Sequence, residues 1–336
     1  TAFIVGIPLF YGIGFVLMVP LVITLSYKYD IPAVYIGLPM LASLSVTHGY
    51  LPPHPSPVAL ISQYHADLGL TLLYGFIAAI PTVIIAGPVF SLTLKKYKQK
   101  PLATFAGKTI PDDELPSLAD SLISALLPVV LIALATLVKL YAGPENTPAK
   151  IIIALGDPVV ALLLTLLYAL YALVLKKGKK LEPCMVSLAE AVKDIAMILL
   201  IVAGAGALKQ ILMDSGTGDQ IAATMTGFHK HPILAAWGIA AFIRVCLGSA
   251  TVAGLTAAGI VAPMLAGSSV NPALIVLATG AGSLMFSHVN DSGFWMFKEY
   301  FNLSIKDTIK TWSLMETIVS IVGLISVLII SFFVSQ

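Results

Sequence analysis

The stretch SLMFSHVNDSGFW, residues 283–295, decides how this chain folds. An apolar run typical of half a membrane helix, residues 271–286, ends inside it. Polar positions then follow, namely Ser287, His288, Asn290, Asp291 and Ser292. In a lipid bilayer, polar groups at mid-depth are tolerated only where they face protein or a water-filled cavity. The stretch is therefore either a helix end at the membrane surface or a discontinuous helix that lines a binding site.

Composition predicts a membrane protein. Of the 336 residues, 58% are hydrophobic and 11% are charged, whereas soluble domains carry about 25% charged residues. The apolar runs are long and unbroken, which favours spanning helices over the short alternating segments of a membrane barrel. A net charge of +2 gives no reason to expect a nucleic acid partner. Cys184 and Cys246 lie in or beside apolar runs and have no metal-ligand spacing, so buried thiols are expected, with no metal and no cofactor.

Glycine and proline divide the chain into broken and continuous elements. Residues 2–26 are interrupted by Pro8, Gly12, Gly14 and Pro20, which favours a re-entrant hairpin with its tip at residues 11–14. Breaks are also expected at residues 47–57 and 248–251. Continuous helices are expected at residues 68–94, 118–139, 158–175, 186–213 and 312–334. The fold class is thus an all-α integral membrane protein, a polytopic helical bundle with re-entrant hairpins and discontinuous helices.

Lysine distribution predicts the topology. The loops at residues 95–108 and 176–180 are strongly basic, which places both on the cytoplasmic side. Counting helices outward from them places residues 61–67 and 214–231 outside and residues 298–310 inside.

The stretch around residue 288 has a twin earlier in the chain. Aligning residue n with n + 240 pairs Pro32-Ala33 with Pro272-Ala273 and Thr47-His48 with Ser287-His288. The topology puts the copies in opposite orientations, and inverted repeats of broken helices build the site of many secondary transporters. A chance match of short apolar segments is the alternative. The predicted divisions are a first, incomplete repeat at 1–94, a cytoplasmic loop at 95–117, linking helices at 118–180 and a second, inverted repeat at 181–336.

The first copy lacks a counterpart of helix 186–213, so we expect at least one further helix before Thr1. The chain also begins inside an apolar run and without Met. Both features indicate that its N-terminal part is incomplete.

Several motifs resemble those of one family. They are LSVTHGYLPPHP at 44–55, GDP at 156–158, Arg244 followed by GSATV at 248–252, and FSHVNDSGFW at 286–295. With these motifs the chain resembles, from Thr1 to its end, the gluconate permease family, gluconate:proton symporters of the ion transporter superfamily. One departure is Gly12, where relatives often have an acidic residue at the hairpin tip. If that acid takes part in proton coupling, the coupling group here must differ.

The resemblance implies a function, which is not enzymatic. The expected protein is a multi-pass secondary active transporter in the bacterial inner membrane, importing gluconate or a related sugar acid with protons by alternating access. Its expected partners are this small carboxylate, H⁺ and the lipid bilayer, and assembly as a homo-oligomer stays open. Relatives also include transporters of other small hydroxy or amino acids such as D-serine, so proton- or sodium-coupled transport of these is an alternative.

Two other classes of protein are weighed against a transporter. A passive anion channel favours a continuous pore with rings of like groups, whereas this chain has two unlike breaks. An intramembrane hydrolase needs Ser and His at an activating spacing, and Ser287 is merely adjacent to His288 in sequence. The chain has no ATP-binding loop, which disfavours a primary pump.

A sugar-acid site needs anion-favouring donors and groups that both donate and accept hydrogen bonds. The helix breaks supply the candidate substrate-binding residues Thr47, His48, Gly49, Ser249, Thr251, Ser287, His288 and Asn290. Candidates for proton coupling are the intramembrane ionisable residues His48, His288, Asp291 and Arg244. Structural alternatives are that Ser and Thr cap the broken helices, that the histidines bind loop carbonyls and that Arg244 clamps such carbonyls. His54 is expected at the outer surface, Asp157 as a helix cap, and Lys209 and Asp214 at a helix end.

Overall fold

The computed structural model describes residues 2–7, 11–101, 116–141, 146–178, 231–265 and 268–334, with scattered positions between 180 and 207. Every regular element within these ranges is helical, which confirms the all-α class. Chain contacts define two compact units, Thr1–Gly107 with Gly204–Gln336 and Lys108–Ala203. The expected helix at residues 186–213, with Lys209 and Asp214, lies largely outside the described residues.

Three helical runs among the described residues are long and apolar enough to cross a membrane, namely Leu68–Leu94, Val159–Lys177 and Ile305–Val334. The first comprises α5 (Leu68–Ile84), a π-helical segment η1 (Ile85–Val89) and a short 3₁₀ turn η2 (Leu92–Leu94). The last comprises α15 (Ile305–Thr308), the π-helical η7 (Ile309–Ser313) and α16 (Leu314–Val334). It begins seven residues before the expected start at residue 312, because Ser304 caps it by accepting a hydrogen bond from Asp307 N at 3.1 Å.

The helices of the first part of the chain begin and end at other residues than the sequence predicted. α1 (Ala2–Gly6) is followed by α2 (Tyr11–Tyr29), which continues through Gly12, Gly14 and Pro20, so residues 11–14 are helical rather than a tip. Similarly, α3 (Ala33–Tyr50) includes residues 47–50, and α4 (Pro55–Tyr64) starts at a proline. The break is therefore confined to residues 51–54, because proline is well tolerated in the first turn of a helix.

The second set of broken elements is closer to expectation. α11 (Pro232–Leu247) ends at Gly248, whose φ of 75° is left-handed, and Ser249 caps α12 (Ala250–Met264) through Val252 N. α13 (Pro272–Gly282) ends four residues before the expected 286, and α14 (Ser292–Tyr300) follows. Ser287-His288 thus lies in an irregular segment, whereas its sequence twin Thr47-His48 is helical.

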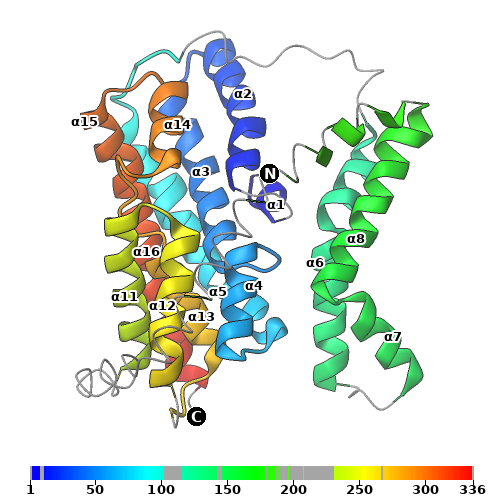
Figure 1. The fold of residues 1–336 in the computed structure, drawn as a ribbon. Coiled ribbons are helices and arrows are strands. Elements are labelled where there is room, and N and C mark those ends of the chain that lie inside the picture. Colours follow the sequence, from blue (N-terminus) through cyan, green and yellow to red (C-terminus); the bar gives the residue numbers. More distant parts are fainter. Residues whose placement is uncertain are drawn as a thin grey trace. The chain divides into compact units, whose positions relative to one another are not determined.

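α13 lies at the centre of its unit. Every residue from Ala273 to Gly282 is buried, and the helix packs against α11, α16, α4 and α5 (Figure 1). Small residues permit this packing, since a side chain at Gly280 would overlap the carbonyl oxygen of Gly49 on α3. Helices in membranes commonly approach one another at such small residues.

The second unit contains α6 (Leu118–Tyr141), α7 (Thr147–Leu155) and α8 (Pro158–Ala169), which continues into η5 (Leu170–Val174) and η6 (Leu175–Lys177). The expected helices at 118–139 and 158–175 are confirmed. Asp157 caps α8 as expected, accepting a hydrogen bond from Val159 N at 2.9 Å. α7 was not expected from the sequence.

Candidate functional site

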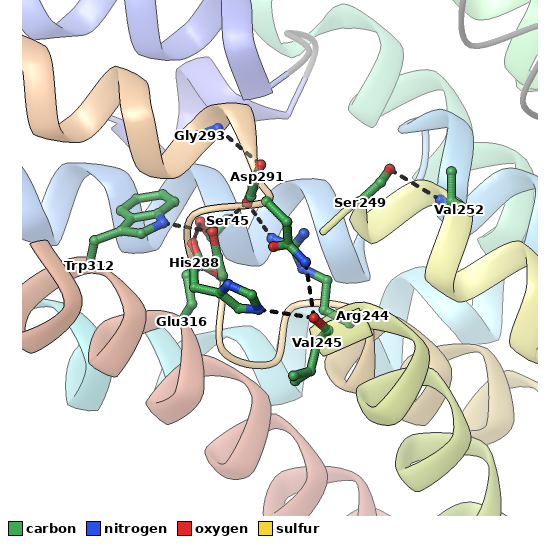
Figure 2. A network of polar contacts seen from close by, with 12 residues as sticks. Ser45, Arg244, Val245, Ser249, Val252, His288, Asp291, Gly293, Trp312 and Glu316 are labelled. Atoms are coloured by element: carbon green, nitrogen blue, oxygen red, sulfur yellow. Dashed lines mark hydrogen bonds and ion pairs between the residues drawn. The ribbon is translucent and has the colours of Figure 1, made fainter. Parts of the chain in front are cut away.

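Arg244 and Asp291 form a charged pair inside the first unit. Arg244 lies in the last turn of α11, is 4% exposed, and donates from Nη2 to Asp291 Oδ2. Asp291 caps α14 by accepting a hydrogen bond from Gly293 N at 2.9 Å. Figure 2 shows the guanidinium reaching from α11 toward the segment that carries Asp291. The pair therefore joins the two broken elements of the second half of the chain.

Ser287 and Trp312 extend this network to the last spanning run. Trp312 Nε1 donates to Ser287 Oγ at 2.8 Å, and the Ser287 hydroxyl donates to Asp291 Oδ2. Trp312 is fully buried in η7. Asp291 thus receives hydrogen bonds from three donors, Arg244, Ser287 and Gly293 N, which fix the orientation of its carboxylate.

Residues from the first half of the chain face the same region. The Tyr11 ring lies 6.0 Å from that of Trp312 and 6.1 Å from that of His48, between ring centroids. The His48 ring lies 5.4 Å from the His54 ring. His54 is 3% exposed and its Nε2 lies 2.7 Å from the carbonyl oxygen of Gly6, so the expectation that it lies at the surface is wrong.

Glu316 is a second buried acid beside this network. It is 2% exposed in the first turn of α16, and the Ser45 hydroxyl on α3 donates to its Oε1. It lies near enough to Arg244 and Asp291 for their charges to act on it. In Figure 2, Glu316 and Ser45 lie beside the Arg244–Asp291 pair.

Several buried polar atoms in this region have no hydrogen-bond partner within the described part of the chain. They are Tyr11 Oη, His48 Nδ1, Arg244 Nε and Nη1, Ser313 Oγ and Glu316 Oε2. Folded proteins satisfy the great majority of buried polar atoms, so a group of unsatisfied ones needs an explanation such as a ligand or solvent. Together they offer a cation, an acid, an imidazole and hydroxyls. We call these five residues the polar cluster.

The polar cluster can bind a hydroxylated anion. Arg244 presents two nitrogen donors without a partner, Nε and Nη1, which suit the oxygens of a carboxylate. Tyr11 and Ser313 hydroxyls both donate and accept hydrogen bonds, as sugar hydroxyls require. No group of three or more His, Cys, Asp or Glu side chains suited to a metal ion occurs among the residues that the structure describes.

His288 and Asn290 each use a side-chain nitrogen to bind backbone carbonyl groups of α11. His288 Nε2 lies 2.9 Å from Val245 O, and Asn290 Nδ2 donates to the same carbonyl oxygen at 3.0 Å and to Cys246 O at 3.3 Å. These carbonyls belong to the last turn of α11, which has no intrahelical donors for them. Both side chains therefore hold the irregular segment against the end of α11.

The other sequence-derived candidates lie at helix ends or in packing contacts. Ser249 accepts a hydrogen bond from Val252 N at 3.4 Å, and Thr251 lies one position into α12. Thr47 is buried and donates to Leu44 O at 2.9 Å, and Gly49 packs against α13. Of the candidates from the sequence, the structure thus brings His48, Arg244, Asp291 and Ser287 together.

Sequence reasoning missed Glu316, Tyr11, Ser45, Ser313 and Trp312. Glu316 had a usable signal, since an acid within a long apolar helix indicates a functional group. The other four had none, because single Tyr, Ser and Trp residues occur throughout membrane helices. Their importance follows from the contacts that bring α2, α3 and η7 together.

A helical membrane bundle with a buried, incompletely satisfied polar cluster drawn from both halves of its chain defines a membrane transport protein. The family model described as GntP family permease matches residues 1–333. The chain therefore belongs to the GntP permease family, and it is a transporter rather than an enzyme.

Three relatives illustrate the range of the family. The chain is 48% identical to the high-affinity gluconate transporter of Escherichia coli K12, over 98% of this chain and 76% of that protein. It is 46% identical to the Gnt-II system L-idonate transporter of the same organism, with the same coverage. It is 45% identical to the gluconate permease of Bacillus subtilis 168, again over 98% and 76%.

Proposed function

We propose that the protein imports gluconate or a closely related sugar acid together with protons across the cytoplasmic membrane of a bacterium, by alternating access. The observation that carries this proposal is Arg244, a buried cation with two unsatisfied N–H positions among unsatisfied hydroxyl and imidazole groups. A buried charge is costly unless it is paired and hydrogen-bonded. A carboxylate substrate with several hydroxyls would satisfy these groups.

The identity of the substrate rests on the relatives. Relatives named for gluconate and for L-idonate match the chain at 48% and 46% identity. Both compounds are six-carbon sugar acids that carry one carboxylate and several hydroxyls. The substrate class is therefore sugar acids, with the Arg244 guanidinium on the carboxylate.

The proposed transport cycle uses two inverted repeats with re-entrant hairpins. The element order helix pair, broken helix and long helix occurs in residues 2–94 and again in 232–334, which supports this division. In Figure 1, α5 and α16 run in opposite directions within the unit, as inverted copies require. The loop at 95–117 and the helices at 118–180 would then connect a first repeat at 1–94 to a second at 181–336.

The sequence-derived site residues divide into two groups within this proposal. His48, Arg244, Asp291 and Ser287 would contact the substrate or proton directly. His288, Asn290, Ser249, Thr251, Thr47 and Gly49 would shape the site by holding helix ends and close helix contacts. The sequence-derived candidates for proton coupling were His48, His288, Asp291 and Arg244; because Arg244 and Asp291 are assigned to the substrate, His48 and His288 are the two that stay.

Uptake into proteoliposomes tests the substrate assignment. The purified protein should catalyse saturable uptake of labelled gluconate, and unlabelled gluconate and L-idonate should compete, whereas an amino acid such as D-serine should not. Empty liposomes are the control. If labelled gluconate does not enter and unlabelled gluconate does not compete, the proposed substrate class is refuted. The description of the fold would not be affected.

A further inference from the structure

Glu316 is a buried acid without a cationic partner. Its Oε1 accepts the Ser45 hydroxyl, its Oε2 has no partner, and the residue is 2% exposed. Among the described residues, the ion pairs within 4.0 Å are Lys100–Asp30, Lys176–Asp120, Arg244–Asp291 and Lys298–Glu299, and Glu316 is in none of them. The other acid of the region, Asp291, has both oxygens bonded.

An unpaired carboxylate in such surroundings is costly, typically by several kcal/mol. Binding one proton removes this charge. Asp291 differs from Glu316 because it has a cationic partner, Arg244. The unpaired acid, Glu316, is therefore suited to bind a proton, whereas the paired acid, Asp291, is suited to hold Arg244 in the substrate site.

The groups that surround Glu316 come from several elements. α3 contributes Ser45, the imidazole of His48, and Tyr50, whose hydroxyl donates to Val319 O at 2.6 Å. α11 contributes Arg244, the segment before α14 contributes Asp291, and α2 contributes Tyr11, which lies within electrostatic reach. Of the other elements against α16, α13 and η1 carry no titratable side chain, α5 carries Tyr74 alone, and η7 carries Lys310, which is exposed.

We propose that Glu316, held by Ser45, is the proton-carrying group of the transport cycle, with the Arg244–Asp291 pair left to the substrate. The carboxylate takes one proton while the site faces outward and releases it while the site faces inward. This inference rests on the proposed sugar-acid transport.

Two assays in proteoliposomes separate proton coupling from substrate binding. The first is accumulation of gluconate under an inward proton gradient. The second is exchange of labelled external for unlabelled internal gluconate at equal pH, which needs binding and the conformational change but no net proton release. For a one-to-one symport of an acid anion with a proton, accumulation should approach about tenfold per pH unit of gradient.

The key variant is Glu316→Gln, which has nearly the shape of the neutral acid but cannot exchange a proton. We expect it to keep exchange and to lose accumulation, with internal gluconate falling to the external concentration. Accumulation equal to that of the wild type would overturn the proposal. Loss of exchange together with accumulation would also overturn it, since Glu316 would then be needed for binding or folding. If the wild type itself takes up no gluconate, the proposed function fails instead.

Two further variants control this result. Glu299→Gln removes an exposed acid, paired with Lys298, and should match the wild type in both assays. Ser45→Ala keeps the acid and removes its hydrogen-bond donor, so accumulation should persist while the pH profile of uptake shifts. An unchanged profile in Ser45→Ala would contradict the role given to the Ser45–Glu316 pair.

Discussion

Arg244 is the residue on which substrate binding should depend most. Its Nη2 is occupied by Asp291, while Nε and Nη1 stay free for a ligand. No other described side chain of the polar cluster carries a permanent positive charge. The guanidinium can serve Asp291 and a substrate carboxylate at once because its donors point in several fixed directions.

Arg244→Lys should therefore raise the KM of gluconate uptake by about tenfold or more. An ammonium group is a single point charge and cannot reproduce the planar set of N–H donors of the guanidinium. Uptake kinetics in proteoliposomes measure this. The control is Lys298→Gln, which removes a cation from an exposed ion pair and should leave KM unchanged. An unaltered KM in Arg244→Lys would remove Arg244 from the substrate site.

The two histidines of the sequence twins should differ in their effects. His48 Nδ1 has no partner, whereas His288 Nε2 is bonded to Val245 O. His48→Asn should reduce uptake with little change in the melting temperature. His288→Ala should lower stability by about 1 kcal/mol, the net value of one hydrogen bond. Melting temperature and uptake measured on both variants check this. Loss of stability in His48→Asn together with loss of uptake alone in His288→Ala would contradict the roles given to the two histidines.

At the scale of elements, the close contact of α3 with α13 holds the first half of the chain against the second. A side chain at Gly280 would overlap Gly49 O, and one at Gly49 would overlap Leu284. Both helices are buried along most of their length, so neither can shift easily. Their separation is therefore set by backbone contact.

Gly280→Ala should destabilise the protein by about 1–3 kcal/mol, the usual effect of overpacking a well-packed interior. Gly238→Ala is the matched control, since an added methyl group on this α11 residue meets nothing within 4 Å. Alanine also favours a helix over glycine by about 1 kcal/mol, so this control should melt at the same or a higher temperature. An equal loss of stability in both variants would show that the α3–α13 contact does not limit the size of the residue at position 280.

Sequence patterns predicted those helix breaks that have local causes. Gly248 and Ser249 were identified because a left-handed glycine and a capping serine act within one turn. Thr47–Tyr50 were expected in a break because of the prolines that follow, yet α3 continues to Tyr50. A proline disfavours helix mainly at the residue before it, and Pro52 therefore excludes Leu51 but not the preceding turn.

The candidate site could be predicted only in part, because sequence patterns indicate local features and not the packing of distant helices. His48, Arg244, Asp291 and Ser287 stand beside glycines and helix breaks, so local sequence indicates them. Glu316 lies inside a continuous helical run and Tyr11 begins α2, and their proximity depends on how α2, α3 and α16 pack. No local pattern encodes that packing.

At the scale of the whole molecule, the account requires the predicted topology, with residues 61–67 outside and the basic loop at 95–108 on the cytoplasmic side. Single cysteines placed in a background of Cys184→Ser and Cys246→Ser test it with a membrane-impermeant maleimide. Lys98→Cys should react in inside-out vesicles, and Ala66→Cys, before α5, in right-side-out vesicles. These positions lie at opposite ends of the Leu68–Leu94 run. Reaction of both from the same side would contradict the topology.

The most direct test of the central claim is the energetics of gluconate transport by the wild-type protein. A proton-coupled transporter should accumulate labelled gluconate in proteoliposomes above its external concentration when the outside is more acidic, and an uncoupler should abolish this accumulation. A passive anion channel, the main rival, would let gluconate equilibrate to equal concentrations with or without the pH gradient once the membrane potential is clamped at zero. Accumulation that the uncoupler collapses is the result we expect, and equilibration unaffected by the gradient would contradict the account.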